Sequence, residues 1–198
     1  PQTISDLRPR VSATQPMPEQ QKYLQAHFEK CAGRVTVQFF DKRHPDNGAT
    51  VRLANMIVEW HPERKERILL CTHYDTRPYA DNDRDPRLKR KPGVFLGAND
   101  GASGPALFCE MAESMKDLPC KYGVDFVLFD GEEFIFDKDR DDPYFLGSEH
   151  FATQYKSNPP GHTYKWGVLV DMIGDKELQL YREVNSMQGP ESQALITD

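Results

Sequence analysis

The chain has 198 residues and a formal net charge of −6 at pH 7. A chain of this length usually forms one domain with a buried core, and its acidic balance argues against a nucleic-acid surface, which would be basic. No apolar run approaches the roughly 18 residues that a bilayer crossing needs, so we expect no membrane span.

Apolar periodicity divides the chain into predicted strands and helices. Apolar residues at helical spacing indicate the helices, and short β-branched or aromatic runs indicate the strands. The predicted elements, in chain order, are a helix at 18–30, strands at 35–40, 51–60 and 67–72, a helix at 105–117, a strand at 122–129, a helix at 147–156, a strand at 166–170 and a short strand at 178–182.

The order of these elements predicts an α/β fold. Strands 35–40 and 51–60 flank a turn that contains Asn47-Gly48, which predicts a hairpin at the sheet edge. The later strands alternate with helices, which predicts a largely parallel core sheet. A polar loop at 76–98 lies between two of these elements, and so long a loop in a compact domain is usually functional or mobile. No internal repeat or linker divides the chain, so we expect a single domain.

Acidic side chains gather where the predicted strands end. Asp130-Gly131-Glu132-Glu133 directly follows an apolar strand, where three acids are costly unless a ligand needs them. One such turn alone is as often a solvated acidic corner, but here a histidine and further acids occupy similar places. They are His73, Asp75, Glu132, Glu133 and Asp171 at strand ends, and Asp100 in a loop that enters a helix. This oxygen and nitrogen donor set predicts a metal site, with zinc as the first choice and manganese or cobalt as alternatives.

Four motifs carry these residues along the chain, and a fifth lies between the last two of them. They are His73-Tyr74-Asp75-Thr76-Arg77-Pro78, 97–104, Asp130-Gly131-Glu132-Glu133, 144–150 and 169–174. Together they resemble the M28 zinc-peptidase family, and within it most closely the zinc-dependent glutaminyl cyclases. The resemblance runs from about Arg8 to the end of the chain. It implies one M28-like catalytic domain over residues 1–198 and a zinc-exopeptidase-like, three-layer sandwich with a mixed, largely parallel central sheet and helices on both faces.

The resemblance also implies a role for most of the acids. Asp100 and Glu133 would be metal ligands that lie side by side. Glu132 would be the catalytic general acid and base. Asp75 would assist catalysis by orienting His73, which is the usual part of a carboxylate placed behind a histidine ligand.

The implied roles of His73 and Asp171 depend on the number of metal ions. In the two-metal peptidases of the family both would bind a second metal, with Asp100 as the bridge, whereas in the single-zinc cyclases Asp171 would assist catalysis by hydrogen bonding. The family completes the site of Asp100 and Glu133 with a histidine from a later loop, and no histidine follows His162 here. We therefore expect a domain truncated at its C-terminus, in which only His73, Asp100 and Asp171 form a complete trio.

Three functions are compatible with these motifs. The leading hypothesis is zinc-dependent cyclisation of the N-terminal glutamine of peptides to pyroglutamate with release of ammonia, for which one zinc ion suffices. The first alternative is an M28-type zinc aminopeptidase that uses two zinc ions to remove N-terminal residues. The second is an inactive family member, or a fragment that lacks the last metal ligand. The substrate of either enzyme would be a peptide or protein N-terminus, and the oligomeric state stays open.

The cysteines leave the compartment undecided. None of the four has CxxC spacing, and Cys71 and Cys109 are predicted to be buried free thiols. Cyclases of this kind often act on secreted peptides, so the resemblance favours a secreted or periplasmic location.

Overall fold

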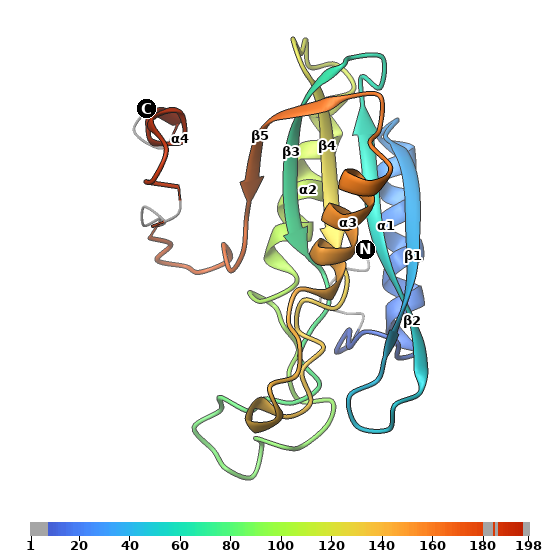
Figure 1. Ribbon diagram of the computed structural model, residues 1–198. Helices are drawn as coiled ribbons and strands as arrows, with labels where there is room; N and C mark the ends of the chain where they lie inside the picture. Colours follow the sequence, from blue (N-terminus) through green and yellow to red (C-terminus); the bar gives the residue numbers. More distant parts are fainter. Residues whose placement is uncertain (1–7, 180–183, 185, 196–198) are drawn as a thin grey trace.

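The computed structural model describes residues 8–179, 184 and 186–195 of the chain (Figure 1). Its elements are α1 (Pro16–Lys30), β1 (Arg34–Arg43), β2 (Thr50–Trp60), β3 (Glu66–His73), α2 (Ser103–Met115), β4 (Gly123–Phe129), the 3₁₀ turn η2 (Lys138–Arg140), α3 (Leu146–Ser157), β5 (Thr163–Leu169) and α4 (Pro190–Leu195). Every predicted element up to residue 170 is confirmed, with ends shifted by a few residues. The strand predicted at 178–182 is wrong at 178 and 179, which lie outside any strand, and 180–182 lie outside the described residues.

The sheet is mixed, with its strands in the order β1-β2-β4-β3-β5. β1 and β2 form the predicted antiparallel hairpin at one edge, and β2 pairs antiparallel with β4. β3 pairs parallel with both β4 and β5, which forms the predicted parallel core. Because parallel strands end at the same side of a sheet, the residues that follow β3, β4 and β5 come together there.

Helices cover both faces of the sheet, which confirms the predicted three layers (Figure 1). On one face, Phe28 of α1 and Phe108 of α2 pack against Phe126 of β4, with ring centroids 6.4 and 4.6 Å from it. On the other face, Phe151 of α3 packs against Phe129. All seven residues of β4 are buried because both faces of this strand are covered, which explains why Asp125 is its only polar side chain.

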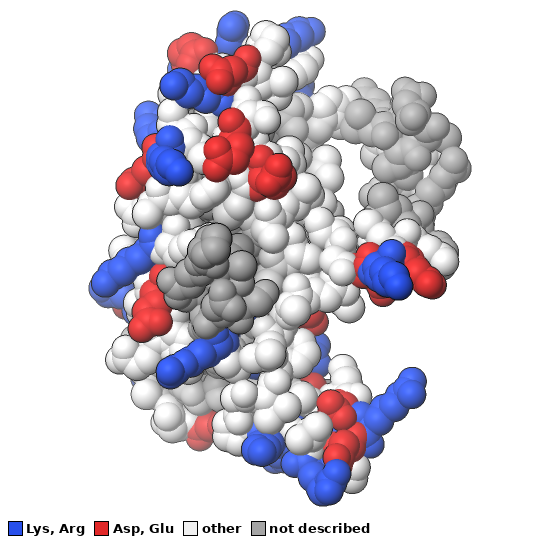
Figure 2. Space-filling model, turned by 180° about the vertical axis from the view of Figure 1, so that it is seen from behind, with Lys and Arg blue, Asp and Glu red and all other residues white. Residues whose placement is uncertain are grey.

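The outer surface of the α1–α2 layer carries charges of both signs. Figure 2 shows Lys and Arg side chains lying among Asp and Glu side chains over this face. None of the described helices combines the length and the apolar character that crossing a bilayer requires.

One charged pair lies inside the sheet. Asp125 interrupts the apolar run of β4, and Arg67 of β3 donates to it with Nε 3.0 Å from both carboxylate oxygens. The exposed fractions of the two side chains are 0% for Arg67 and 1% for Asp125. The Tyr164 hydroxyl of β5 donates a further bond to Asp125 over 2.7 Å. The pair therefore ties the three parallel strands together near their N-terminal ends.

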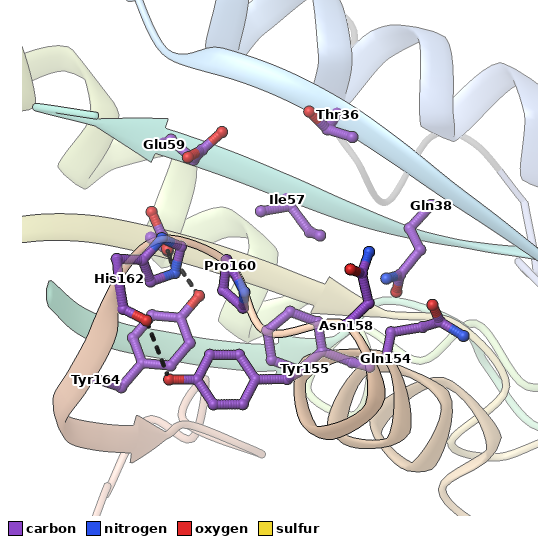
Figure 3. A pocket seen from close by; sticks show the side chains of 12 residues that line it. Thr36, Gln38, Ile57, Glu59, Gln154, Tyr155, Asn158, Pro160, His162 and Tyr164 are labelled. Carbon is purple, nitrogen blue, oxygen red and sulfur yellow. Dashed lines mark hydrogen bonds and ion pairs between the residues drawn. The ribbon is translucent and has the colours of Figure 1, made fainter. Parts of the chain in front are cut away.

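A pocket of about 280 Å³ lies beside this pair on the α3 face of the sheet (Figure 3). The rings of Tyr155 and Tyr164 stack in its wall with centroids 5.3 Å apart, and the Tyr155 hydroxyl donates to the His162 carbonyl over 3.4 Å. Its walls come from β1, β2 and the second half of α3, from the segment that leads into β5, and from the N-terminal halves of β4 and β5. The pocket is therefore separate from the acids at the strand ends.

Candidate metal centre

Three of the predicted ligands meet at the carboxyl ends of the parallel strands. His73 is the last residue of β3, Asp171 follows β5, and Asp100 lies in the loop that enters α2. The His73 Nε2 atom lies 3.1 Å from Asp100 Oδ1 and 3.2 Å from Asp171 Oδ1. One ligand atom from each of the three lies within 4.8 Å of the others, so the fold brings the trio together as a group that can hold one ion.

Hydrogen bonds between two loops place the carboxylates of the trio beside each other. Asn99 Oδ1 accepts the Gly174 N–H over 2.7 Å. The Ser103 hydroxyl donates to the Asn99 carbonyl over 2.6 Å and accepts a backbone N–H from the loop after β5 over 3.1 Å. The loop that carries Asp100 is thereby fastened to the loop that carries Asp171.

Gly101 allows the chain to bring Asp100 this close to β3. Its φ angle of +85° lies in the left-handed region that glycine adopts at no steric cost. A Cβ atom at this position would lie 2.1 Å from the Asp75 carbonyl oxygen. A larger residue at 101 would therefore displace Asp100 from His73.

The Asp75 carboxylate braces the corner that carries Glu132 and Glu133. Its oxygens accept the Glu132 N–H over 3.2 Å and the Glu133 N–H over 2.9 Å. The His73 Nδ1 atom lies 3.5 Å from Asp75 Oδ1, which is longer than a normal hydrogen bond. The orienting role of Asp75 toward His73 therefore stays a prediction. The sequence did not indicate the hydrogen bonds that Asp75 accepts from the backbone of Glu132 and Glu133.

Glu132 and Glu133 face different partners. Glu132 Oε2 lies 3.9 Å from His73 Nδ1, beside the trio. Glu133 lies outside the trio, because its Oε1 accepts a hydrogen bond from Arg77, which also pairs with Asp81 over 3.1 Å. The other oxygen of Glu133, Oε2, is buried and has no hydrogen-bond partner among the described residues. Glu133 therefore keeps one buried carboxylate oxygen that a ligand could use.

Four residues that hold this site in place had no predicted role: Ser12, Arg77, Asn99 and Ser103. The Ser12 hydroxyl donates to Asp130 Oδ1 over 2.5 Å and lies 3.3 Å from Asp75 Oδ2, behind the acidic corner. Ser12 belongs to no motif, so nothing in the sequence marks it. The other three lie inside the motifs, and that position was the only available indication of their importance.

Burial and the crowding of acids change the pKa values in the site. Burial raises the pKa of Glu132 to about 7, and neighbouring carboxylates add to the rise while His73 opposes it. Burial also raises the pKa of Glu133 to about 7, against the hydrogen bond from Arg77. Burial alone would lower the pKa of His73, but hydrogen bonds to the carboxylates of the trio raise it far above its ordinary value. Without a bound metal, the site therefore retains protons near neutral pH.

The donor set fits a zinc ion. An imidazole nitrogen and carboxylate oxygens are usual zinc ligands, and three protein ligands leave a position open for substrate, as in catalytic zinc sites. A divalent cation would replace the His73 proton and offset the charge of the surrounding acids.

We expect the metal-free protein to lose stability as the pH rises from about 5.5 to about 8. The folded-state pKa values of Glu132 and Glu133 lie above their ordinary values, so the folded state holds protons that the unfolded chain has already released. Stability then falls with rising pH until these carboxyls ionise near pH 7. The pKa of His73 is raised as well. Its contribution to the stability therefore also decreases with rising pH, once the pH exceeds the pKa that histidine has in the unfolded chain.

The change of the urea unfolding midpoint with pH, measured in the presence of a chelator, gives the slope of stability against pH. With saturating zinc the slope should become shallower, because the metal takes the place of the bound protons. A midpoint that rises between the two pH values in the chelated sample would contradict the expectation.

The chain matches the family model described as Peptidase family M28 over residues 55–198. This region contains the whole trio and the acidic corner. The chain belongs to peptidase family M28. The M28 match begins within β2, so it covers β3, β4 and β5, whose carboxyl ends carry the candidate metal centre.

Solved and curated relatives of this M28 chain include cyclases and an exopeptidase. A glutaminyl cyclase from Fimbriiglobus ruber is 40% identical, with a TM-score of 0.90 over 97% of this chain and 65% of its own. A Zn-dependent exopeptidase from Parabacteroides distasonis is 28% identical, with a TM-score of 0.83 over 98% of this chain and 66% of its own. The glutaminyl-peptide cyclotransferase of Bos taurus is 31% identical over 61% of this chain and 36% of its own length. The M28 chain thus spans just under two thirds of these solved relatives and about a third of the curated one.

Proposed function

We propose that this M28 protein is a zinc-dependent glutaminyl-peptide cyclotransferase, which converts the N-terminal glutamine of peptides to pyroglutamate. The observation that carries the choice is its similarity, over nearly the whole chain, to the Fimbriiglobus ruber glutaminyl cyclase. A partly buried glutamate with a pKa of about 7 beside a trio of metal ligands supports the same choice.

The strand-end residues would hold the metal. His73, Asp100 and Asp171 would be the ligands, so Asp171 would bind the metal here rather than assist by hydrogen bonding, as the resemblance to the single-zinc cyclases implies. When bound, zinc supplies Lewis-acid polarisation of the glutamine side-chain carbonyl. One ion suffices for this reaction, because cyclisation needs no activated water.

Glu132 is the proposed carrier of the proton. The α-amine nitrogen of the substrate attacks the side-chain amide carbon, the ring C–N bond forms, and ammonia leaves as the former C–N bond breaks. Glu132 takes a proton from the attacking amine and returns one to the leaving nitrogen, so the reaction consumes no net proton. A pKa of about 7 suits both transfers near neutral pH. Because the ring closure is intramolecular, holding the glutamine side chain bent toward its own amine supplies much of the rate.

Mass spectrometry of two peptides tests the proposal. The full chain is incubated with zinc and with peptides that differ only in starting with Gln or with Leu, and a chelated sample is the control. We expect the Gln peptide to lose the mass of ammonia and the Leu peptide to stay unchanged. Removal of the first Leu would instead support the aminopeptidase, the alternative favoured by similarity to the Parabacteroides distasonis exopeptidase. If neither peptide changes, both enzyme hypotheses fail for this chain and the inactive family member remains.

A further inference from the structure

A second group of possible metal ligands lies between α1 and α2. His27 and Cys31 are one turn apart at the end of α1, and Cys109 and Glu113 are one turn apart on α2. Residues four apart share one face of a helix, so the two pairs can face each other across the helix contact. Glu113 lies ten residues along α2 from Ser103 (113 − 103), which is about 15 Å of helix, so this group is separate from the strand-end trio.

The distances in this group suit a tetrahedral metal ion. His27 Nε2 lies 3.8 Å from Cys31 Sγ and 3.8 Å from Glu113 Oε1, and all three ligand atoms lie within 4.8 Å of one another. Tetrahedral zinc with ordinary bond lengths separates such ligand atoms by about 3.3–3.6 Å, so small side-chain movements would close the site. Thiolate, imidazole and carboxylate together are a donor set that zinc accepts readily.

The surroundings of these ligands allow a metal to enter. Cys31 is buried at 7% exposure, whereas the side chains of His27 and Glu113 are 22% and 57% exposed, so the group opens to solvent on its Glu113 side. All four cysteines of the chain are free, and Cys109 is partly buried rather than fully buried as predicted. In the metal-free state His27 Nε2 bonds to the Cys109 carbonyl over 3.0 Å, and a metal would have to replace that bond.

We propose that His27, Cys31 and Glu113 bind a zinc ion that joins α1 to α2. On binding, the Cys31 thiol releases its proton to solvent as the sulfur–zinc bond forms. His27 Nε2, which donates its proton to the Cys109 carbonyl in the metal-free state, exchanges that bond for a bond to the metal, and the ring proton moves through solvent from Nε2 to Nδ1. The fourth position takes water. The site holds two helices together at the layer that covers one face of the sheet, and it takes no part in the reaction proposed above.

Cobalt(II) absorption tests this site independently of any activity. Cobalt bound to a thiolate absorbs strongly in the near ultraviolet through charge transfer from sulfur, and the strand-end trio contains no sulfur. We expect the reduced, metal-free full chain to develop this band on titration with cobalt and to lose it when zinc is added. A wild-type protein that binds cobalt without the band would overturn the proposal.

Variants assign the band to its ligands. Cys31→Ser should abolish it, and Glu113→Gln, an exposed change that should not disturb folding, should weaken cobalt binding at this site. The matched controls are Cys120→Ser, which changes another partly buried thiol, and Glu110→Gln, which changes an exposed acid one turn earlier on α2. Both should keep the band. The visible absorption of cobalt at the strand-end trio should persist in Cys31→Ser and so report that this variant is folded.

Two further results would contradict the assignment. A band that survives in Cys31→Ser would place the thiolate elsewhere. Undiminished cobalt binding in Glu113→Gln would remove the carboxylate from the ligand set and with it the three-ligand site. Failure of the cyclase assay would leave these measurements unaffected, because they do not depend on turnover.

Discussion

Glu132→Gln is expected to lower kcat for cyclisation of an N-terminal glutamine by about 10²–10⁴-fold, because an amide cannot accept the proton of the attacking amine. The substitution keeps the size of the side chain and its place beside His73. Zinc content and KM should change little, because Glu132 is not a member of the metal-binding trio. Steady-state kinetics and metal analysis of the same preparation measure all three quantities.

The pH profile separates a proton carrier from a structural residue. In the wild type, kcat should rise as the pH passes the Glu132 pKa and should level off above it, since the ionised carboxylate is the active form. Because bound zinc favours that form, this pKa should lie below the metal-free value of about 7. The kcat of Glu132→Gln should not show this rise with pH. Glu63→Gln is the matched control, because its side chain is 64% exposed and pairs with Arg64 at the surface. Wild-type turnover in Glu132→Gln would refute the assigned role.

Asp125→Ala is expected to destabilise the fold by about 3–5 kcal/mol, because it leaves the Arg67 guanidinium buried without its counter-charge. Arg67 would keep only backbone carbonyl acceptors, such as those of Trp60 and His61. Tyr164 would lose its acceptor as well. The fall in the free energy of unfolding, from urea denaturation at constant pH, measures this cost.

Two controls test whether burial is the cause. Asp41→Ala removes the partner of Arg52 in a pair that is 68% and 49% exposed, and this should cost no more than about 1 kcal/mol. Arg67→Met combined with Asp125→Leu removes both charges and should recover most of the loss, because no unpaired charge is then buried. Equal losses of unfolding free energy in Asp125→Ala and Asp41→Ala would show that burial does not increase the cost of removing one partner of an ion pair.

Most strands and helices could be predicted from the sequence because their apolar patterns are local. The run at 124–129, apolar apart from Asp125, indicated a strand buried in a sheet, and the structure has α1 and α2 on one face of β4 and α3 on the other. The turn with Asn47-Gly48 indicated the edge hairpin for an equally local reason, since that pair favours a tight turn. The strand predicted at 178–182 rested on a short run with no turn to bound it, and it failed at its first two residues.

The candidate site divides in the same way. By itself, the sequence determined which acids stand at strand ends, because the strands were recognisable and the acids directly follow them. Only the tertiary structure decided which of these acids meet. Asp100 and Asp171 come together through loop contacts, and Glu133 turns toward Arg77.

The zinc site proposed between α1 and α2 also depends on tertiary structure, since each helix contributes only part of the ligand set. Helix periodicity placed each pair of ligands on one face of its own helix. The packing of α1 against α2 then set Glu113 Oε1 3.8 Å from His27 Nε2. The physical reason is common to both sites. Periodicity reflects interactions among a few neighbouring residues, whereas a metal site needs ligand atoms from distant segments within a few ångströms of one another. Only the packing of loops and helices sets those distances.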